Sequence, residues 1–184
     1  MSGTIILVPG YTNSGPEHWQ SYIERKFKNV VRVDQLEWDN PVRSHWIAGL
    51  EKTIAATTGE LFLVGHSCGA MTIAQWSEHH FSPRVKGALL VAPADVDAAS
   101  APLAIQVQRP VALTPFPFPT TLVYSDNDPY LCVERAKIFA NNWASSKLIE
   151  IPGAGHIHTA AGFGEWPAGE QLLIELCGFE LERR

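Results

Sequence analysis

Three residue types that could together perform nucleophilic catalysis occur along the chain in the order serine, aspartate, histidine. The serine, Ser67, is the centre of a G-x-S-x-G string over residues 65–69. A serine hydroxyl is a weak nucleophile, so it needs a base to take its proton, and the base needs an acid to orient it. Asp128 and His156 follow Ser67 in the order that such sites use. The chemistry that this set predicts is attack on an acyl carbonyl.

The surroundings of Ser67 predict a sharp turn from a strand into a helix. The apolar run Leu61–Gly65 is typical of a strand, and a helical pattern follows over Gly69–His80. Glycines on both sides of the turn would leave room for it and lift the hydroxyl clear of the sheet. The alternative to a catalytic serine is a glycine-rich turn in which Ser67 only caps the helix. Cys68 would point elsewhere, so we expect its side chain to be packed and its backbone N–H to serve an oxyanion.

The acid and the base each have competitors. Asp128 and Asp126 both follow the apolar run Thr120–Ser125, but Asp126 comes directly after it and is expected to bond local backbone N–H groups. Asp95, also at a strand end, is the next alternative for the acid. His156 lies in a glycine-flanked loop after another apolar run, and with His158 it forms an H-x-H pair. No third ligand is visible, so we predict no metal site.

The second oxyanion donor is expected from the loop after the first apolar run. There Gly10 would let the chain turn, so that the N–H of Tyr11 or Thr12 faces the same point as that of Cys68. The same residues also describe a plain polar loop that leads into a helix with Pro16 in its first turn. Both interpretations are compatible.

Short apolar runs alternate with amphipathic stretches along the whole chain, which predicts how these residues are positioned. The runs predicted as strands are Thr4–Val8, Val30–Asp34, Leu61–Gly65, Gly87–Ala92, Thr120–Ser125 and Leu148–Ile151. The stretches predicted as helices are Pro16–Lys28, His45–Thr57, Gly69–His80, Val133–Trp143 and Ala168–Leu181. The rhythm favours an α/β fold with about six parallel strands buried on both faces and helices on both sides.

We expect the strand order 2-1-3-4-5-6, which brings the loop after the first strand and the turn at Ser67 to one switch point. The segment Asp95–Pro119 breaks the rhythm. It carries five prolines, at positions 102, 110, 115, 117 and 119. It is long for a structureless loop, and it is either an irregular surface excursion or a border of the cleft.

Composition excludes several classes of protein. The 184 residues suit one domain, residues 1–184, and 46% hydrophobic with 18% charged residues is an ordinary globular balance. The net charge of −5 with scattered Lys and Arg favours neither nucleic acid nor an anionic membrane as a partner. Three cysteines without paired spacing and no long apolar run predict a cytoplasmic protein with reduced thiols. No dinucleotide or phosphate-loop motif is present, so no cofactor is predicted.

Several motifs together resemble one family. They are Val-Pro-Gly-Tyr with Ser-Gly-Pro-Glu-His-Trp-Gln, Gly-His-Ser-Cys-Gly, Ala-Leu-Leu-Val-Ala-Pro, Pro-Phe-Pro, Ser-Asp-Asn-Asp-Pro-Tyr, Gly-Ala-Gly-His-Ile-His and Gly-Phe-Gly-Glu-Trp-Pro. From Ile5 to about Leu173 the chain is similar to the small α/β-hydrolases related to retinoblastoma-binding serine hydrolase and its bacterial relatives. The resemblance implies a minimal α/β-hydrolase fold, with Ser67, Asp128 and His156 at the positions of the catalytic triad.

The resemblance implies no particular substrate and no retinoblastoma binding, because the L-x-C-x-E string is absent. The function expected is hydrolysis of small acyl esters through an acyl-enzyme, with His18, Phe116, Phe118 and Trp166 as pocket walls. The alternatives are a weakly catalytic binding or regulatory protein on the same fold, and a thioesterase or peptidase using the same three residues. The sequence predicts no oligomeric state.

Overall fold

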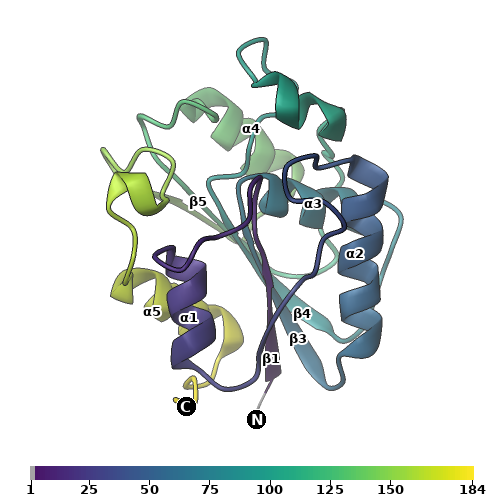
Figure 1. Cartoon of the computed structure of the whole chain (residues 1–184), viewed down its shortest axis with the longest axis vertical. Helices are drawn as coiled ribbons and strands as arrows, with labels where there is room; N and C mark the ends of the chain where they lie inside the picture. The colour runs from purple at the N-terminus through teal and green to yellow at the C-terminus, as the bar shows by residue number, and fades with distance from the viewer. Residues whose placement is uncertain (1–2) are drawn as a thin grey trace.

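The six predicted strands form one parallel sheet in the computed structural model, which describes residues 3–184 (Figure 1). In sheet order they are β2 (Val30–Arg32), β1 (Gly3–Val8), β3 (Glu60–His66), β4 (Val85–Val91), β5 (Thr120–Tyr124) and β6 (Lys147–Glu150). The predicted order 2-1-3-4-5-6 is therefore confirmed. All neighbouring strands are parallel, so their carboxyl ends share one edge of the sheet.

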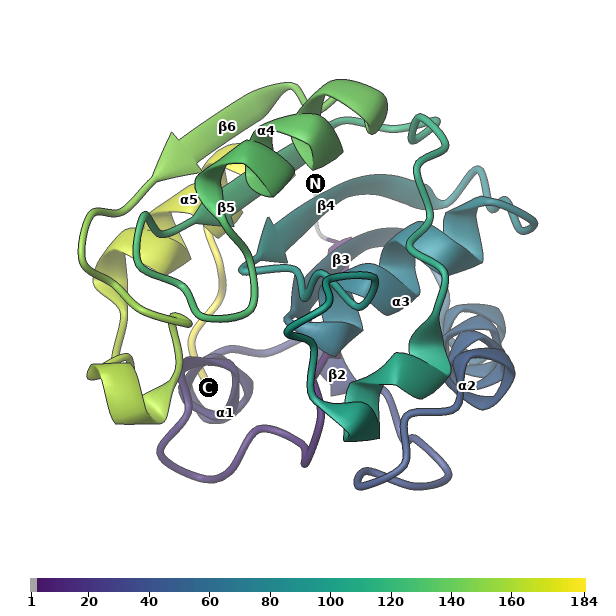
Figure 2. The ribbon, with the colours of Figure 1, turned by 90° about the horizontal axis from the view of Figure 1, so that it is seen from above.

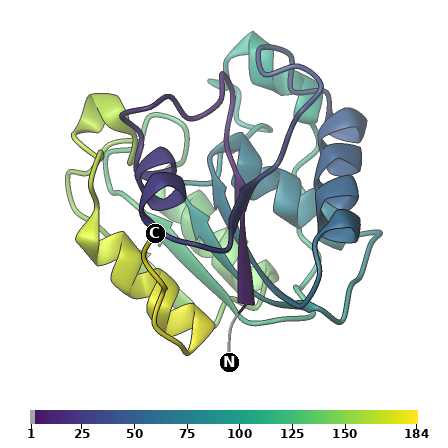
Figure 3. The ribbon, with the colours of Figure 1, turned by 60° about the horizontal axis from the view of Figure 1, so that its bottom comes forward.

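Within the described residues, five α-helices cover the two faces of the sheet. They are α1 (Trp19–Lys26), α2 (Arg43–Ala56), α3 (Cys68–Ser77), α4 (Val133–Asn142) and α5 (Pro167–Cys177). Seen from above, α2 and α3 lie on one side of the sheet while α1 and α5 lie on the other (Figure 2). Figure 3 shows the same division, with yellow α5 and purple α1 on one side and blue α2 on the other.

The alternation of side chains along β1 explains why both faces are covered. Ile6 and Val8 belong to a hydrophobic core shared with α2, α3 and α4, whereas Ile5 and Leu7 belong to a second core shared with α1 and α5. Successive strand residues point to opposite faces, so an unbroken apolar run needs a helical layer on each side. The apolar runs in the sequence therefore explain why helices pack on both faces of the sheet.

The edge strands differ from the prediction. We expected Leu148–Ile151 to be buried on both faces, but in β6 three of the four residues are exposed, and Leu148 is 40% exposed. The reason is its place at the edge of the sheet, where it has a strand neighbour on one side only. At the other edge β2 has three residues, shorter than the predicted Val30–Asp34.

The proline-rich segment between β4 and β5 contains one short 3-10 helix, η1 (Leu103–Gln108). The segment is tied to α3 by buried polar side chains. Gln108 Nε2 donates to Thr72 Oγ1 at 3.1 Å, and Gln75 Nε2 donates to the Gln108 carbonyl at 2.6 Å. The segment is therefore held against the helix that begins directly after Ser67.

Candidate active site

Ser67 occupies a strained turn between β3 and α3. Its φ of 55° and ψ of −122° lie in a region that residues with a side chain rarely adopt. The flanking glycines make the turn possible because the chain crosses itself closely there. A β-carbon on Gly69 would lie 1.9 Å from the Val8 carbonyl oxygen, and one on Gly65 would lie 2.6 Å from the Ala70 α-carbon. The predicted strand-to-helix turn is present, and it sets Ser67 at the carboxyl edge of the sheet.

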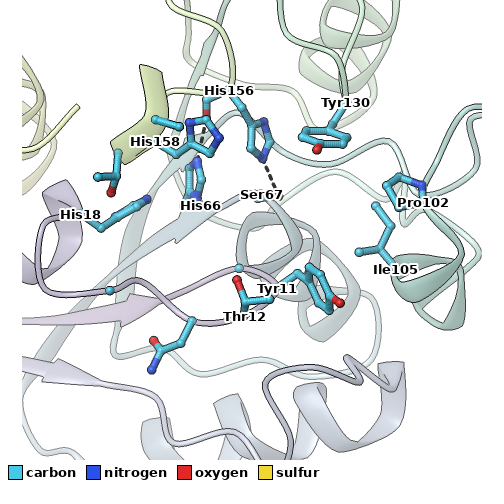
Figure 4. Close-up of a pocket in the computed structure, with 15 residues that line it drawn as sticks. Tyr11, Thr12, His18, His66, Ser67, Pro102, Ile105, Tyr130, His156 and His158 are labelled. Atoms are coloured by element: carbon cyan, nitrogen blue, oxygen red, sulfur yellow. Dashed lines mark hydrogen bonds between the residues drawn. The ribbon is translucent and has the colours of Figure 1, made fainter. Parts of the chain in front are cut away.

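Ser67, His156 and Asp128 form one chain of hydrogen bonds at that edge, of which Figure 4 shows the His156–Ser67 contact. His156 Nε2 is 2.8 Å from Ser67 Oγ, while His156 Nδ1 is 2.9 and 3.0 Å from the two carboxylate oxygens of Asp128. A carboxylate only accepts, so Nδ1 carries the proton and Nε2 presents its lone pair to the serine hydroxyl. All three side chains are buried. The arrangement can take a proton from Ser67 and stabilise the resulting imidazolium.

The two alternative acids are engaged elsewhere. Asp126 Oδ1 accepts a hydrogen bond from the backbone N–H of Gly153 at 2.7 Å, which agrees with the predicted backbone role. Asp95 forms a two-pronged ion pair with Arg135 of α4, with N–O distances of 2.7 and 3.0 Å. Neither carboxylate therefore orients the imidazole of His156.

Asp126 is part of a larger contact that sequence reasoning missed. After β5, three consecutive side chains accept hydrogen bonds from the loop that carries His156. Each of the three accepts from a different one of three consecutive backbone N–H groups. Ser125 Oγ accepts from Ala154 at 2.9 Å, and Asn127 Oδ1 accepts from Gly155 at 2.7 Å. The loop bearing Asp128 is thus held against the loop bearing His156. The Ser-Asp-Asn run at a strand end was the available signal, because these residue types favour bonds to backbone.

The loop after β1 approaches the turn at Ser67. A β-carbon on Gly10 would lie 3.0 Å from Ser67 Cβ and 3.5 Å from the Cys68 nitrogen. The N–H of Thr12 donates to the Trp38 carbonyl at 2.9 Å, so Thr12 is not available as an oxyanion donor. Within residues 3–184, the backbone N–H groups of Tyr11 and Cys68 donate to no backbone carbonyl, and both lie beside the Cys68 thiol. Burial raises the pKa of the Cys68 thiol to about 12, so this side chain stays neutral.

A pocket of about 510 Å³ opens at these residues. It is lined by Gly10, Tyr11, Thr12, Asn13, Gly15, His18, His66, Ser67, Pro102, Ile105, Tyr130, His156, His158, Thr159 and Ala160. Pro102 and Ile105 belong to the proline-rich segment, so this segment borders the site as one of the two interpretations predicted. Because Ser67 and His156 both line the pocket, a ligand there would meet the serine hydroxyl.

Three more histidines surround His156 and are uncharged at neutral pH. Burial lowers the pKa of His18 to about 3 and holds that of His66 well below its usual range. Burial and the neighbouring His156 also lower the pKa of His158. His66 Nε2 donates to the His156 carbonyl at 2.8 Å and so helps to fix the backbone of the histidine loop. Within the described residues, no group of three or more His, Cys, Asp or Glu is arranged to hold a metal ion.

Three of the four predicted wall residues do not line this pocket. Phe116 and Phe118 are buried in the core beside α4, where the Phe116 ring packs edge-on against Trp143. Trp166 lies in the other core, edge-on to Trp19. Large aromatic side chains bury most area inside a core, which is where these three are. Of the four, only His18 lines the pocket.

Comparison with known proteins places this geometry in a family. The family model described as serine hydrolase matches residues 5–175. The chain belongs to the serine hydrolase family. The resemblance expected from the sequence motifs is therefore confirmed at the level of the family. Curated protein sequences give no match.

Solved structures of similar proteins share this fold. A YdeN-like hydrolase from Pectobacterium atrosepticum is 33% identical, with a TM-score of 0.84 over 95% of this chain and 90% of that one. The ydeN gene product from B. subtilis is 19% identical, with a TM-score of 0.75 over 96% of this chain and 100% of that one. Est1E from Butyrivibrio proteoclasticus, solved with ferulic acid bound, shares the fold at 14% identity, with a TM-score of 0.70 over 96% and 90% of the two chains. In this serine hydrolase, no helix of the described part is long and apolar enough to cross a membrane.

Proposed function

We propose that this serine hydrolase is a carboxylesterase that cleaves small acyl esters, with Ser67 as nucleophile, His156 as general base and Asp128 as the orienting acid. The observation that carries the proposal is the 2.8 Å contact between His156 Nε2 and Ser67 Oγ. This distance allows direct proton transfer when the hydroxyl attacks. The strained backbone at Ser67 supports it further, because strain of this kind is kept where it serves a site.

The first half of the reaction forms an acyl-enzyme. Ser67 Oγ attacks the ester carbonyl carbon while His156 Nε2 takes the hydroxyl proton. The backbone N–H groups of Cys68 and Tyr11 would donate hydrogen bonds to the negatively charged carbonyl oxygen, since neither donates to a backbone carbonyl within residues 3–184. The tetrahedral intermediate then expels the alcohol, whose oxygen takes the proton from His156.

The second half releases the acid. Water attacks the acyl carbon and gives its proton to His156, and Ser67 leaves with that proton restored to Oγ. Asp128 keeps the imidazole in the required tautomer throughout, because both of its oxygens face Nδ1. Every step uses side chains and backbone groups present in the chain.

The test is covalent labelling together with turnover. A fluorophosphonate probe should label the wild-type protein, and Ser67→Ala should abolish both labelling and p-nitrophenyl acetate hydrolysis with little change in melting temperature. Labelling that persists in the variant would contradict the assignment of the nucleophile. A wild-type protein that neither labels nor turns over would favour the binding or regulatory alternative. Comparison of acyl thioester and peptide substrates with esters separates the remaining chemistries.

A further inference from the structure

The pocket has two unlike sides, separated by Ser67 and His156 (Figure 4). On one side His18, His66 and His158 gather around the histidine loop. On the other side Tyr130, Pro102 and Ile105 present mainly apolar surface. A substrate whose reacting carbonyl lies at Ser67 would therefore extend one part of itself along each side. The part of the substrate on the histidine side meets polar groups, and the part on the other side meets mainly apolar groups.

Neither side offers a full charge. Among the fifteen residues that line the pocket there is no Asp, Glu, Lys or Arg. Burial lowers the pKa of each histidine on the polar side below its usual value, so these rings are neutral at pH 7. A charged substrate group would lose hydration here without gaining a partner of opposite charge.

His18 presents a hydrogen-bond donor that the protein does not use. Its Nδ1 accepts a hydrogen bond from the Gln20 backbone N–H at 3.2 Å, at the start of α1. In the neutral ring the proton therefore resides on Nε2. The side chain is 5% exposed, and Nε2 has no hydrogen-bond partner within residues 3–184. Nδ1 of His158, on the same side, is also without a partner there.

A buried donor without an acceptor is unfavourable, so an acceptor atom on this side of the pocket gains the hydrogen bond at His18 once the ring, which lines the pocket, turns Nε2 toward it. We propose that the substrate is an uncharged ester that carries an ether, hydroxyl or carbonyl oxygen on the His18 side and an apolar group on the Ile105 side. This inference rests on the proposed esterase function, because it takes Ser67 as the reacting centre. It assigns His18 a role in specificity and leaves the chemical steps unchanged.

The experiment uses His18→Asn and two pairs of uncharged esters that differ by one oxygen atom. Asparagine retains an oxygen that caps α1 but is too short to replace Nε2. On the acyl side the pair is p-nitrophenyl methoxyacetate and p-nitrophenyl butyrate. On the alcohol side the pair is 2-methoxyethyl acetate and butyl acetate. Within each pair, the ratio of the two kcat/KM values is measured in the wild type and in the variant, which cancels intrinsic reactivity.

His18→Asn should lower the ratio in one of the two pairs about threefold to tenfold, the change expected for one neutral hydrogen bond. The pair that responds shows whether the acyl or the alcohol part lies on the His18 side. His45→Asn, an exposed histidine on α2, is the matched control and should leave both ratios unchanged. Unchanged ratios in both pairs for His18→Asn would overturn the role of His18.

Charged esters test the second element of the inference. We expect p-nitrophenyl hydrogen glutarate to have a lower kcat/KM than p-nitrophenyl valerate, and acetylcholine a lower value than 3,3-dimethylbutyl acetate. A charged ester that is the better substrate in either pair would overturn the uncharged class. Fluorophosphonate labelling of the wild type and of His18→Asn distinguishes failure of the substrate inference from failure of the proposed esterase function. If both proteins label but the ratios do not respond, the substrate inference fails while the proposed function stands.

Discussion

Replacing Asp128 by asparagine tests the orientation of the base most directly, because the structure determines what the amide would do. Both carboxylate oxygens face His156 Nδ1, at 2.9 and 3.0 Å. Asp128 Oδ1 also accepts a hydrogen bond from the Tyr130 backbone N–H at 2.8 Å. In Asp128→Asn the amide oxygen must take the position facing Tyr130, since an NH₂ group there would meet another donor.

The amide NH₂ group then occupies the position of Oδ2, 2.9 Å from Nδ1. A protonated Nδ1 would face this second donor, so the imidazole proton moves to Nε2 and the ring accepts from the amide instead. In that tautomer Nε2 has no lone pair for the Ser67 hydroxyl. The expected loss in kcat is about ten-thousand-fold, the size found for the same change in a known triad. The shape of the side chain is conserved, so the melting temperature should change little.

The assay is p-nitrophenyl acetate turnover with folding followed by circular dichroism. Asp126→Asn is the matched control, because its amide oxygen can still accept from the Gly153 N–H. We expect this control to retain most of the activity. If Asp126→Asn loses more activity than Asp128→Asn, the acid has been misassigned and the tautomer argument fails.

Three further predictions concern the supports of the site. Asn127→Ala removes the acceptor for a backbone N–H of the histidine loop and should lower kcat about tenfold to a hundredfold, as measured with p-nitrophenyl acetate. Asn127→Asp keeps an acceptor oxygen and should recover most of that loss, whereas equal losses would rule out the hydrogen bond as the cause. Because burial lowers the pKa of His18 from 6.5 to about 3, the unfolded chain binds a proton between these pH values that the folded chain does not. The free energy of unfolding should therefore fall as the pH drops below 6.5, by about 1 kcal/mol between pH 6.5 and pH 5.5 for this residue. Urea titrations should show a smaller pH dependence in His18→Asn than in the wild type, and an equal dependence would count against the buried neutral ring. A β-carbon on Gly69 would lie 1.9 Å from the carbonyl oxygen at the end of β1, so Gly69→Ala should lower stability by about 3 kcal/mol, whereas Gly15→Ala, with open space around it, should keep the wild-type melting temperature.

Local patterns in the sequence were sufficient for the sheet and for the turn at Ser67. Apolar runs of four to six residues predicted the strands, and strands joined by helices run parallel, so a doubly wound fold with the order 2-1-3-4-5-6 was the expectation. Gly65 and Gly69 were informative for the same reason, since only glycine fits where backbone approaches backbone this closely. The common edge of Ser67, Asp128 and His156 was predictable because each follows a strand.

The tertiary structure decided what depends on distances between remote segments. Asp126 and Asp128 have nearly the same sequence context, and only the path of the loop 28 residues further on determines which carboxylate meets Nδ1. Thr12 was excluded as an oxyanion donor by a carbonyl of a different loop.

Burial of particular side chains was likewise beyond the reach of local pattern. Phe116, Phe118 and Trp166 are as apolar as any pocket wall, yet they fill the two cores instead. The neutral histidines around His156 come from β3 and from loops separated by more than a hundred residues. Residue type and local spacing determine which elements form. The packing of the helices against the sheet determines which side chains are in contact and how far water is excluded from them. Desolvation of a side chain depends on all the atoms packed around it, and not only on its neighbours in the sequence.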